Sequence, residues 1–164
     1  IYEYWFCEER VSMDVKLVNP FIDAFTTVLP QMGFPTPERT GMGVKDKHIE
    51  SLGVSVLVGF TKEIRGNVVY NMNEETAKFI ASTMMMGMPI AAFDEMAQSA
   101  ISEMSNMLTA NAATNLAALG REVDISTPSL TVGAGAQIRI SAGQFLTVNM
   151  DLGGHVVEID IAVE

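Results

Sequence analysis

Ser99, Glu103 and Asn106 are the residues whose types and spacing could do chemistry, within the segment SAISEMSNML (99–108). In an α-helix, positions i, i+4 and i+7 lie within about 60° of one another around the axis. The rest of this polar face carries only uncharged side chains, those of Gln98, Ser102, Ser105 and Thr109. Such a face costs little to desolvate and leaves the carboxylate free for a cation on another molecule. The pattern indicates a contact surface; a face covered by the protein's own loops is the alternative.

One long helix must position these residues, because apolar side chains recur on its other side. The expected apolar face consists of Met96, Ala97, Ala100, Ile101, Met104, Met107 and Leu108. Asp94 suits the N-cap, and Gly120 suits the end of the helix.

The remaining elements follow from periodicity and from turn residues. A helix is expected over 13–31, with a possible second segment starting at Asn19-Pro20, followed by an irregular stretch, GFPTPERTG (33–41). A second helix should open at Asn73 and stop at Gly87. Strands rich in β-branched residues are expected over 54–60, 66–72, 123–126, 130–140, 144–151 and 155–163, with turns at Ala142-Gly143 and Gly153-Gly154.

The order of helix, strands, two helices and strands contains no βαβ alternation. It predicts an α+β domain in which a mainly antiparallel sheet packs against long helices, with a weak internal pseudo-repeat. We expect residues 13–164 to form one domain. Residues 1–12 differ in composition, and we interpret them as an extension of uncertain origin or as an added edge strand.

Composition limits the possible partners and locations. The formal net charge of −10 opposes binding to nucleic acid or to an anionic membrane. The single cysteine, Cys7, cannot form an internal disulfide, and no uninterrupted apolar run is long enough to span a bilayer. These features favour a cytoplasmic protein without a membrane segment.

Other sites of chemistry have little support in the sequence. His48 and His155 are isolated from other ligands, so no metal site is expected. VGAGA (132–136) sits within a strand pattern and is interpreted as a turn or bulge. For MMMGM (84–88), core filling at a helix end is preferred over a soft binding surface.

The motif and its surroundings resemble the CheC/CheX/FliY family of chemotaxis phosphatases. That family's signature is an Asp or Ser, then Glu-x-x-Asn, and a Pro somewhat over twenty residues later; Ser99, Glu103, Asn106 and Pro128 match it. The first helix, NPFIDAFTTVLPQM (19–32), has no second Glu-x-x-Asn, so the chain is most similar to the CheX type, whose members are typically homodimers.

The resemblance implies an enzyme that removes the aspartyl phosphate of a phosphorylated CheY-like response regulator. Asn106 would orient the attacking water and Glu103 would pair with a lysine of the partner, while Ser99 and Ser102 would belong to the contact surface. The phosphatase would hold no cofactor of its own, since Mg²⁺ would be bound by the response regulator. Two alternatives stay open: a non-catalytic module that binds a phosphorylated regulator or flagellar switch component, and a structural dimer.

Overall fold

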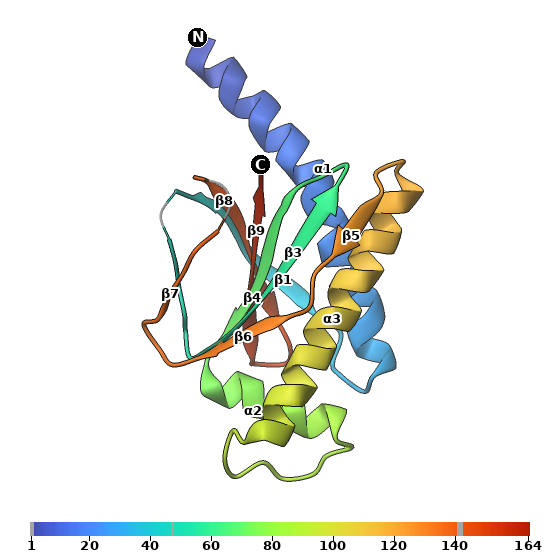
Figure 1. Ribbon diagram of the computed structural model, residues 1–164, viewed down its shortest axis with the longest axis vertical. Helices are drawn as coiled ribbons and strands as arrows, with labels where there is room; N and C mark the ends of the chain where they lie inside the picture. The colour runs from blue at the N-terminus through green and yellow to red at the C-terminus, as the bar shows by residue number, and fades with distance from the viewer. Residues whose placement is uncertain (1, 47, 141–142) are drawn as a thin grey trace.

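The fold is an α+β arrangement in which three helices pack against a mainly antiparallel sheet, as the sequence predicts (Figure 1). The computed structural model describes residues 2–46, 48–140 and 143–164, and side chains from Lys16 onward. The helices are α1 (Tyr2–Gln31), α2 (Glu74–Met84) and α3 (Glu95–Ala118). The strands are β1 (Glu38–Lys45), β2 (Ile49–Glu50), β3 (Val54–Lys62), β4 (Gly66–Met72), β5 (Val123–Ile125), β6 (Ser129–Val132), β7 (Gln137–Ile138), β8 (Phe145–Asp151) and β9 (Val156–Val163).

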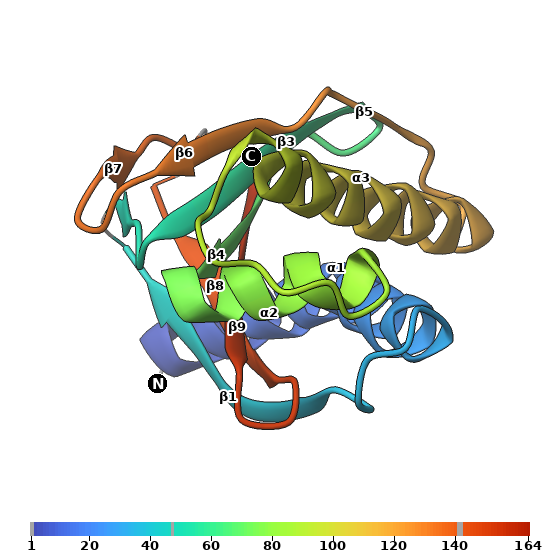
Figure 2. The same ribbon diagram turned by 90° about the horizontal axis from the view of Figure 1, so that it is seen from below.

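The main sheet has the strand order β1-β8-β9-β4-β3-β5. β6 also belongs to this sheet and, like β5, pairs with β3. All of these neighbours are antiparallel, and β2 and β7 form a separate two-stranded sheet. The three helices lie together on one side of the main sheet, which curves around them (Figure 2). The hydrophobic core fills the space between the helices and this face.

Alternation along the strands decides which side chains enter that core. In β3, Val54, Val56, Val58 and Phe60 are fully or almost fully buried on the helix side. Tyr70 of β4 faces the same way, and its hydroxyl lies 2.9 Å from the hydroxyl of Thr109 in α3. This contact joins the sheet to the middle of α3.

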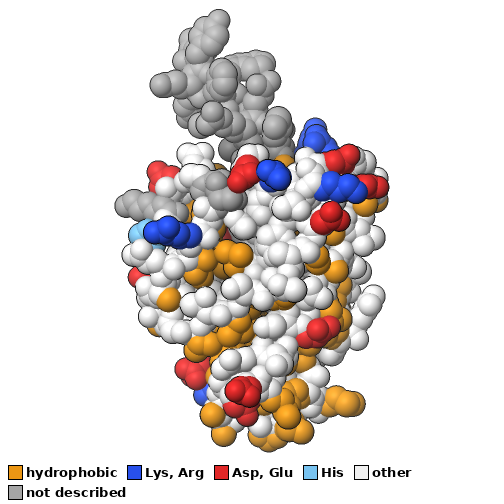
Figure 3. All heavy atoms as spheres, viewed as in Figure 1, with side chains coloured by type: hydrophobic (Ala, Val, Ile, Leu, Met, Phe, Trp, Pro, Cys, Tyr) orange, Lys and Arg blue, Asp and Glu red, His pale blue; other side chains and the backbone are white. Residues whose placement is uncertain are grey.

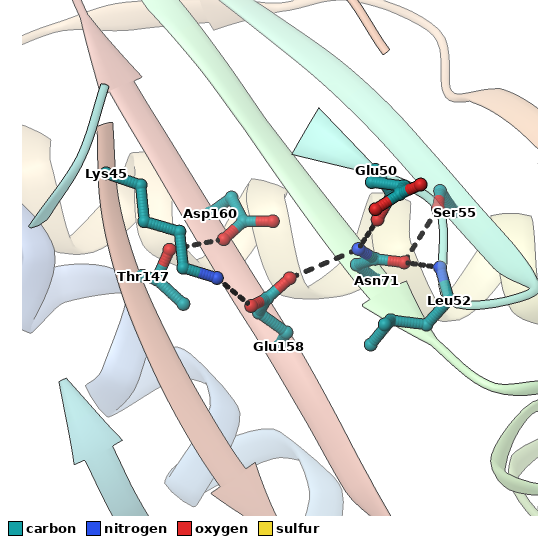
Figure 4. A network of polar contacts seen from close by, with 8 residues as sticks. All are labelled: Lys45, Glu50, Leu52, Ser55, Asn71, Thr147, Glu158 and Asp160. Atoms are coloured by element: carbon teal, nitrogen blue, oxygen red, sulfur yellow. Dashed lines mark hydrogen bonds and ion pairs between the residues drawn. The ribbon is translucent and has the colours of Figure 1, made fainter. Parts of the chain in front are cut away.

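The opposite face of the sheet carries a polar network (Figure 4). Lys45 of β1 forms an ion pair of 2.9 Å with Glu158 of β9. The side chain of Asn71 donates to Glu158 and accepts from the backbone of Leu52, and so joins β4 and β9 to the turn after β2. Beside them, Asp160 is 1% exposed.

Several expected elements are confirmed by their end residues. Asn73 accepts from the backbone of Thr76 at the start of α2, and Asp94 accepts from the backbone of Ala97 at the start of α3. The predicted strands over 54–60, 66–72, 123–126, 144–151 and 155–163 correspond to β3, β4, β5, β8 and β9. The turn at Gly153-Gly154 is also present, with positive φ at both glycines. Ala142, in the other expected turn, lies outside the described residues.

The N-terminal expectations need correction. Residues 2–12 are part of α1, so the alternative of an added edge strand is wrong. No glycine or proline occurs before Pro20, and the helical pattern therefore continues backward from residue 13. A separate segment beginning at Pro20 is also wrong, because α1 runs through this proline; the ring removes one backbone donor while the packed flanking residues keep the helix intact.

The strand expectations need two further corrections. The stretch 33–41 is not wholly irregular, since β1 begins at Glu38 and pairs with β8. The predicted strand 130–140 is divided into β6 and β7, because Gly133 and Gly135 adopt positive φ and turn the chain between them. The interpretation of residues 132–136 as a turn is thereby confirmed.

Candidate functional site

The polar face of α3 borders an open groove of about 620 Å³. Six residues of α3 line it at helical spacings of three and four: Glu95, Gln98, Ser99, Ser102, Glu103 and Asn106. The opposite wall consists of Thr127, Pro128 and Leu130. The structure thus brings together all four predicted site residues, and it places the distant proline of the motif beside them.

Hydrogen bonds to the edge of β3 place the opposite wall. β5 and β6 pair with the two ends of β3, and Ser126 bridges the gap between them. The backbone N–H of Ser126 donates to the carbonyl of Gly59, and its hydroxyl accepts from the N–H of Gly59, both at 2.8 Å. The following residues, Thr127 and Pro128, are consequently held alongside α3.

Glu103 and Asn106 are available to another molecule. Glu103 is exposed and Asn106 is half-buried. Within the part of the chain that the structure describes, neither side chain has a hydrogen-bond or ion-pair partner. The alternative that loops of the same chain cover this face is therefore wrong for Glu103.

The charge of the groove is negative, because Glu95 and Glu103 line it and none of the described Lys, Arg and His residues does. A cationic side chain of a partner would be attracted to such a surface. Glu95 is a lining residue that the sequence interpretation omitted. Its position four residues before Ser99 placed it on the same helix face, and this spacing could have identified it.

Two expected members of the polar face point elsewhere. Ser105 and Thr109 are 0% and 1% exposed, and Thr109 lies against the sheet. Each hydroxyl donates to the carbonyl four residues earlier, and Thr109 also meets the hydroxyl of Tyr70. These bonds satisfy the buried hydroxyl groups, so the surface face of α3 is narrower than the sequence predicts.

The apolar face of α3 also differs at one end. Ala97, Ile101, Met104 and Leu108 are buried as expected, but Met96 is 63% exposed. Met96 lies in the first turn, where α3 extends past the sheet (Figure 1). Its predicted position in the core is wrong.

The described residues include no group of three or more His, Cys, Asp or Glu side chains that could hold a metal ion. Among the same residues, no helix is long and apolar enough to cross a membrane. The polar groups that line the groove are the carboxylates of Glu95 and Glu103, the amides of Gln98 and Asn106, and three hydroxyl groups, those of Ser99, Ser102 and Thr127.

Comparison with known proteins identifies the family. A family model described as "Chemotaxis phosphatase CheX" matches residues 54–151, which include α3 and both walls of the groove. The chain belongs to the CheX family. A curated CheX relative from Thermotoga maritima, named "CheY-P phosphatase CheX", is 34% identical over 129 residues, which cover 77% of this chain and 82% of that protein.

Solved CheX structures share the fold. A crystal structure of CheX in complex with CheY, BeF₃ and Mg²⁺, from Borrelia burgdorferi, is 31% identical with a TM-score of 0.73, covering 90% of this chain and 97% of that one. CheX from Vibrio vulnificus is 26% identical with a TM-score of 0.80, covering 91% and 99% of the two chains. The roles of Glu103 and Asn106 within this CheX-family groove stay predictions.

Proposed function

We propose that this chain is a phosphatase that hydrolyses the aspartyl phosphate of a CheY-like response regulator. The observation that carries the proposal is the pair formed by Glu103 and Asn106, which are unpaired and face one open groove, in a chain of the CheX family. The name of the Thermotoga maritima relative and the CheY complex of the Borrelia burgdorferi relative support the same substrate.

Asn106 is proposed to position the attacking water. An acyl phosphate is already reactive, so catalysis requires a water in line with the phosphorus and stabilisation of the moving charge. The amide carbonyl can accept a hydrogen bond from this water, and the NH₂ group can donate to an oxygen nearby, without a change of protonation. Asn106 is half-buried and its helix is fixed to the sheet by the Tyr70–Thr109 contact, which restricts its orientation.

Glu103 is proposed to dock the partner. Its exposed carboxylate lies one turn from Asn106 and would pair with a lysine of the response regulator, which fixes the position of the phosphoryl group relative to the amide. Ser99 and Ser102 would contribute only to the contact surface. The reactive aspartate and Mg²⁺ would both belong to the phosphorylated regulator, and the phosphatase would need no cofactor of its own.

The decisive experiment measures phosphate release from a phosphorylated CheY-like regulator of the same organism in a Mg²⁺-containing buffer. Wild-type protein should accelerate release, and Asn106→Ala should reduce this acceleration by about 100-fold or more, because the water is no longer oriented. Asn111→Ala is the matched control, since Asn111 is half-buried in the same helix but does not line the groove. An unchanged rate for Asn106→Ala would refute the proposed role.

Glu103→Ala should act on binding. We expect the half-saturating concentration of the regulator to rise about tenfold while the maximal rate changes little, because an ion pair between two proteins is lost. Glu75→Ala, an exposed glutamate of α2, is the control. Complex formation by the wild-type protein without any faster phosphate release would instead favour a non-catalytic binding module.

The proposal includes a cytoplasmic homodimer. β1 stands at the edge of the main sheet, and its Met42 and Val44 are 40% and 52% exposed, so this edge can accept a second chain. The cytoplasm is supported by the substrate and by the single cysteine. Light scattering coupled to gel filtration would test the dimer; a monomer at all concentrations would contradict it.

A further inference from the structure

An uncharged segment connects α2 to the groove. No Asp, Glu, Lys or Arg occurs between Lys78 and Asp94 in a chain with 20 acidic and 10 basic residues. The second half of this uncharged segment forms the connection from α2 to α3. Hydrophobic side chains gather at this end of the molecule (Figure 3). This end is therefore an apolar surface on a protein whose net charge is −10.

Three methionines form the exposed part of this surface, which we call the methionine surface: Met86, Met88 and Met96. Their exposed fractions are 98%, 54% and 63%. The expectation that MMMGM fills the core is thus wrong for Met86 and Met88. Both lie beyond the last turn of α2, where the chain turns away from the sheet.

The backbone keeps the methionines exposed. Met86 has a φ of 59°, in the left-handed region that ordinary residues occupy at a cost of about 1–2 kcal/mol. The adjacent Gly87 has a φ of 85°, and its N–H donates to the carbonyl of Ser82 at 2.7 Å. This hydrogen-bonded turn therefore exposes the side chain of Met86 to solvent. Both the left-handed backbone of Met86 and the exposure of its apolar side chain are energetically unfavourable.

One member of the methionine surface, Met96, lies in the first turn of α3, where the groove begins. Met96 follows Glu95 directly and precedes Gln98 by two positions, and both of these neighbours line the groove. The side-chain amide of Gln98 donates to the carbonyl of Phe93 at 3.2 Å. A groove residue thus holds the end of the uncharged segment in place.

We propose that the methionine surface is the second half of the docking site and receives an apolar patch of the same response regulator. This inference rests on the proposed function, because it assigns an additional contact to the same partner. Protein interfaces commonly combine an apolar area with a charged rim, and here the methionines would supply the former while Glu95 and Glu103 supply the latter. Methionine is suited to this role because its flexible side chain adapts to the surface it meets.

The inference predicts a regulator with an apolar patch next to the lysine that pairs with Glu103. Removal of the methionines should weaken docking without a change in the hydrolytic step, since none of them lines the groove. The double variant Met86→Gln/Met88→Gln replaces them with polar side chains of similar length. Leu119→Gln is the control, because Leu119 is 64% exposed just after the other end of α3.

The test uses the full chain and a CheY-like regulator of the same organism. In phosphate-release assays, the double variant should raise the half-saturating regulator concentration about tenfold and leave the maximal rate within about twofold, while the control matches the wild type. Equal half-saturation for the double variant and the wild type would overturn the inference. A fall in maximal rate alone would also overturn it.

A binding measurement separates this inference from the proposed chemistry. If the wild-type protein does not accelerate phosphate release, the phosphatase proposal fails, but calorimetric titration with the regulator loaded with BeF₃ and Mg²⁺ still tests docking. Binding that is about tenfold weaker for the double variant supports the methionine surface. Equal binding by the two proteins, or no binding by the wild type, overturns the inference. Loss of a dimer with unchanged regulator affinity would assign the surface to a second copy of the chain and would likewise overturn the inference.

Discussion

Replacement of Asp160 with asparagine should stabilise the protein, and the gain should increase with pH. Asp160 is 1% exposed; one carboxyl oxygen accepts from the hydroxyl of Thr147 at 2.8 Å, and the other has no hydrogen-bond partner among the described residues. Burial first, and then the nearby charge of Glu158, raise the pKa of Asp160 from 3.8 to about 8, although the hydrogen bond from Thr147 and the charge of Lys45 act in the opposite direction. The carboxyl group is therefore mostly protonated in the folded protein at pH 7.

The sign and size of the effect follow from proton linkage. Between pH 4 and pH 8, unfolded chains release the proton of Asp160 while folded chains retain it, so the free energy of unfolding falls as pH rises. Each unit of pKa difference corresponds to about 1.4 kcal/mol, which amounts to roughly 4 kcal/mol at pH 7. Asparagine carries no such proton, and its carbonyl oxygen can still accept from Thr147.

The assay is urea unfolding of the wild type and Asp160→Asn at a series of pH values between 4.5 and 8. We expect nearly equal stability at pH 4.5 and an advantage of at most about 4 kcal/mol for the variant near pH 7.5. Asp124→Asn, at an exposed position of β5, controls for the change in net charge. A gain that is the same at every pH, or a loss that grows with pH, would refute the protonated state of Asp160.

Two further predictions concern the contacts that hold α3 and β4. Burial raises the pKa of Tyr70, so its hydroxyl stays protonated and donates to Thr109. Tyr70→Phe should lower the free energy of unfolding by about 1 kcal/mol. Thr109→Val should lower it further, because this variant leaves the buried tyrosine hydroxyl unpaired. Equal losses in thermal unfolding of the two variants would contradict this account. Gly66→Ala should destabilise the protein by about 2 kcal/mol or more, because a Cβ atom at Gly66 would collide with the backbone carbonyl of Ala162. Gly43→Ala in β1 should have little effect on stability, because a Cβ atom there meets nothing within 4 Å. Similar chemical denaturation midpoints for the two glycine variants would contradict the collision.

Local sequence signals were sufficient to predict where α2 and α3 begin and where most strands lie. Asn73 and Asp94 each precede a helical pattern, and an N-cap bond depends only on residues three positions away. The grouping of Ser99, Glu103 and Asn106 followed in the same way from helical spacing. Features determined by neighbours in the sequence could therefore be predicted from the sequence.

Features determined by residues that are distant in the sequence could not be predicted in this way. β1 has a polar sequence with two glycines, and it becomes a strand because β8, over a hundred residues later, offers an edge to pair with. Ser105 and Thr109 have the residue types of a surface, but the hydroxyl of Tyr70 and the carbonyl groups of α3 make their burial possible. Met96 has a residue type that is common in cores, but the sheet does not extend to cover the first turn of α3 (Figure 1).

One continuous stretch of chain supplies the described lining of the groove, from Glu95 to Leu130. Its two walls are joined by the second half of α3 and by β5. The support from outside this stretch comes from α1 and α2, which pack against α3, and from the edge of β3, which binds β5 and β6 through backbone pairing. Because α3 also supplies core residues such as Ile101 and Leu108, the helix that presents the site is part of the core of the fold. Removal of this stretch would therefore disrupt the core together with the site, whereas substitutions at positions that line the groove can remove the site alone.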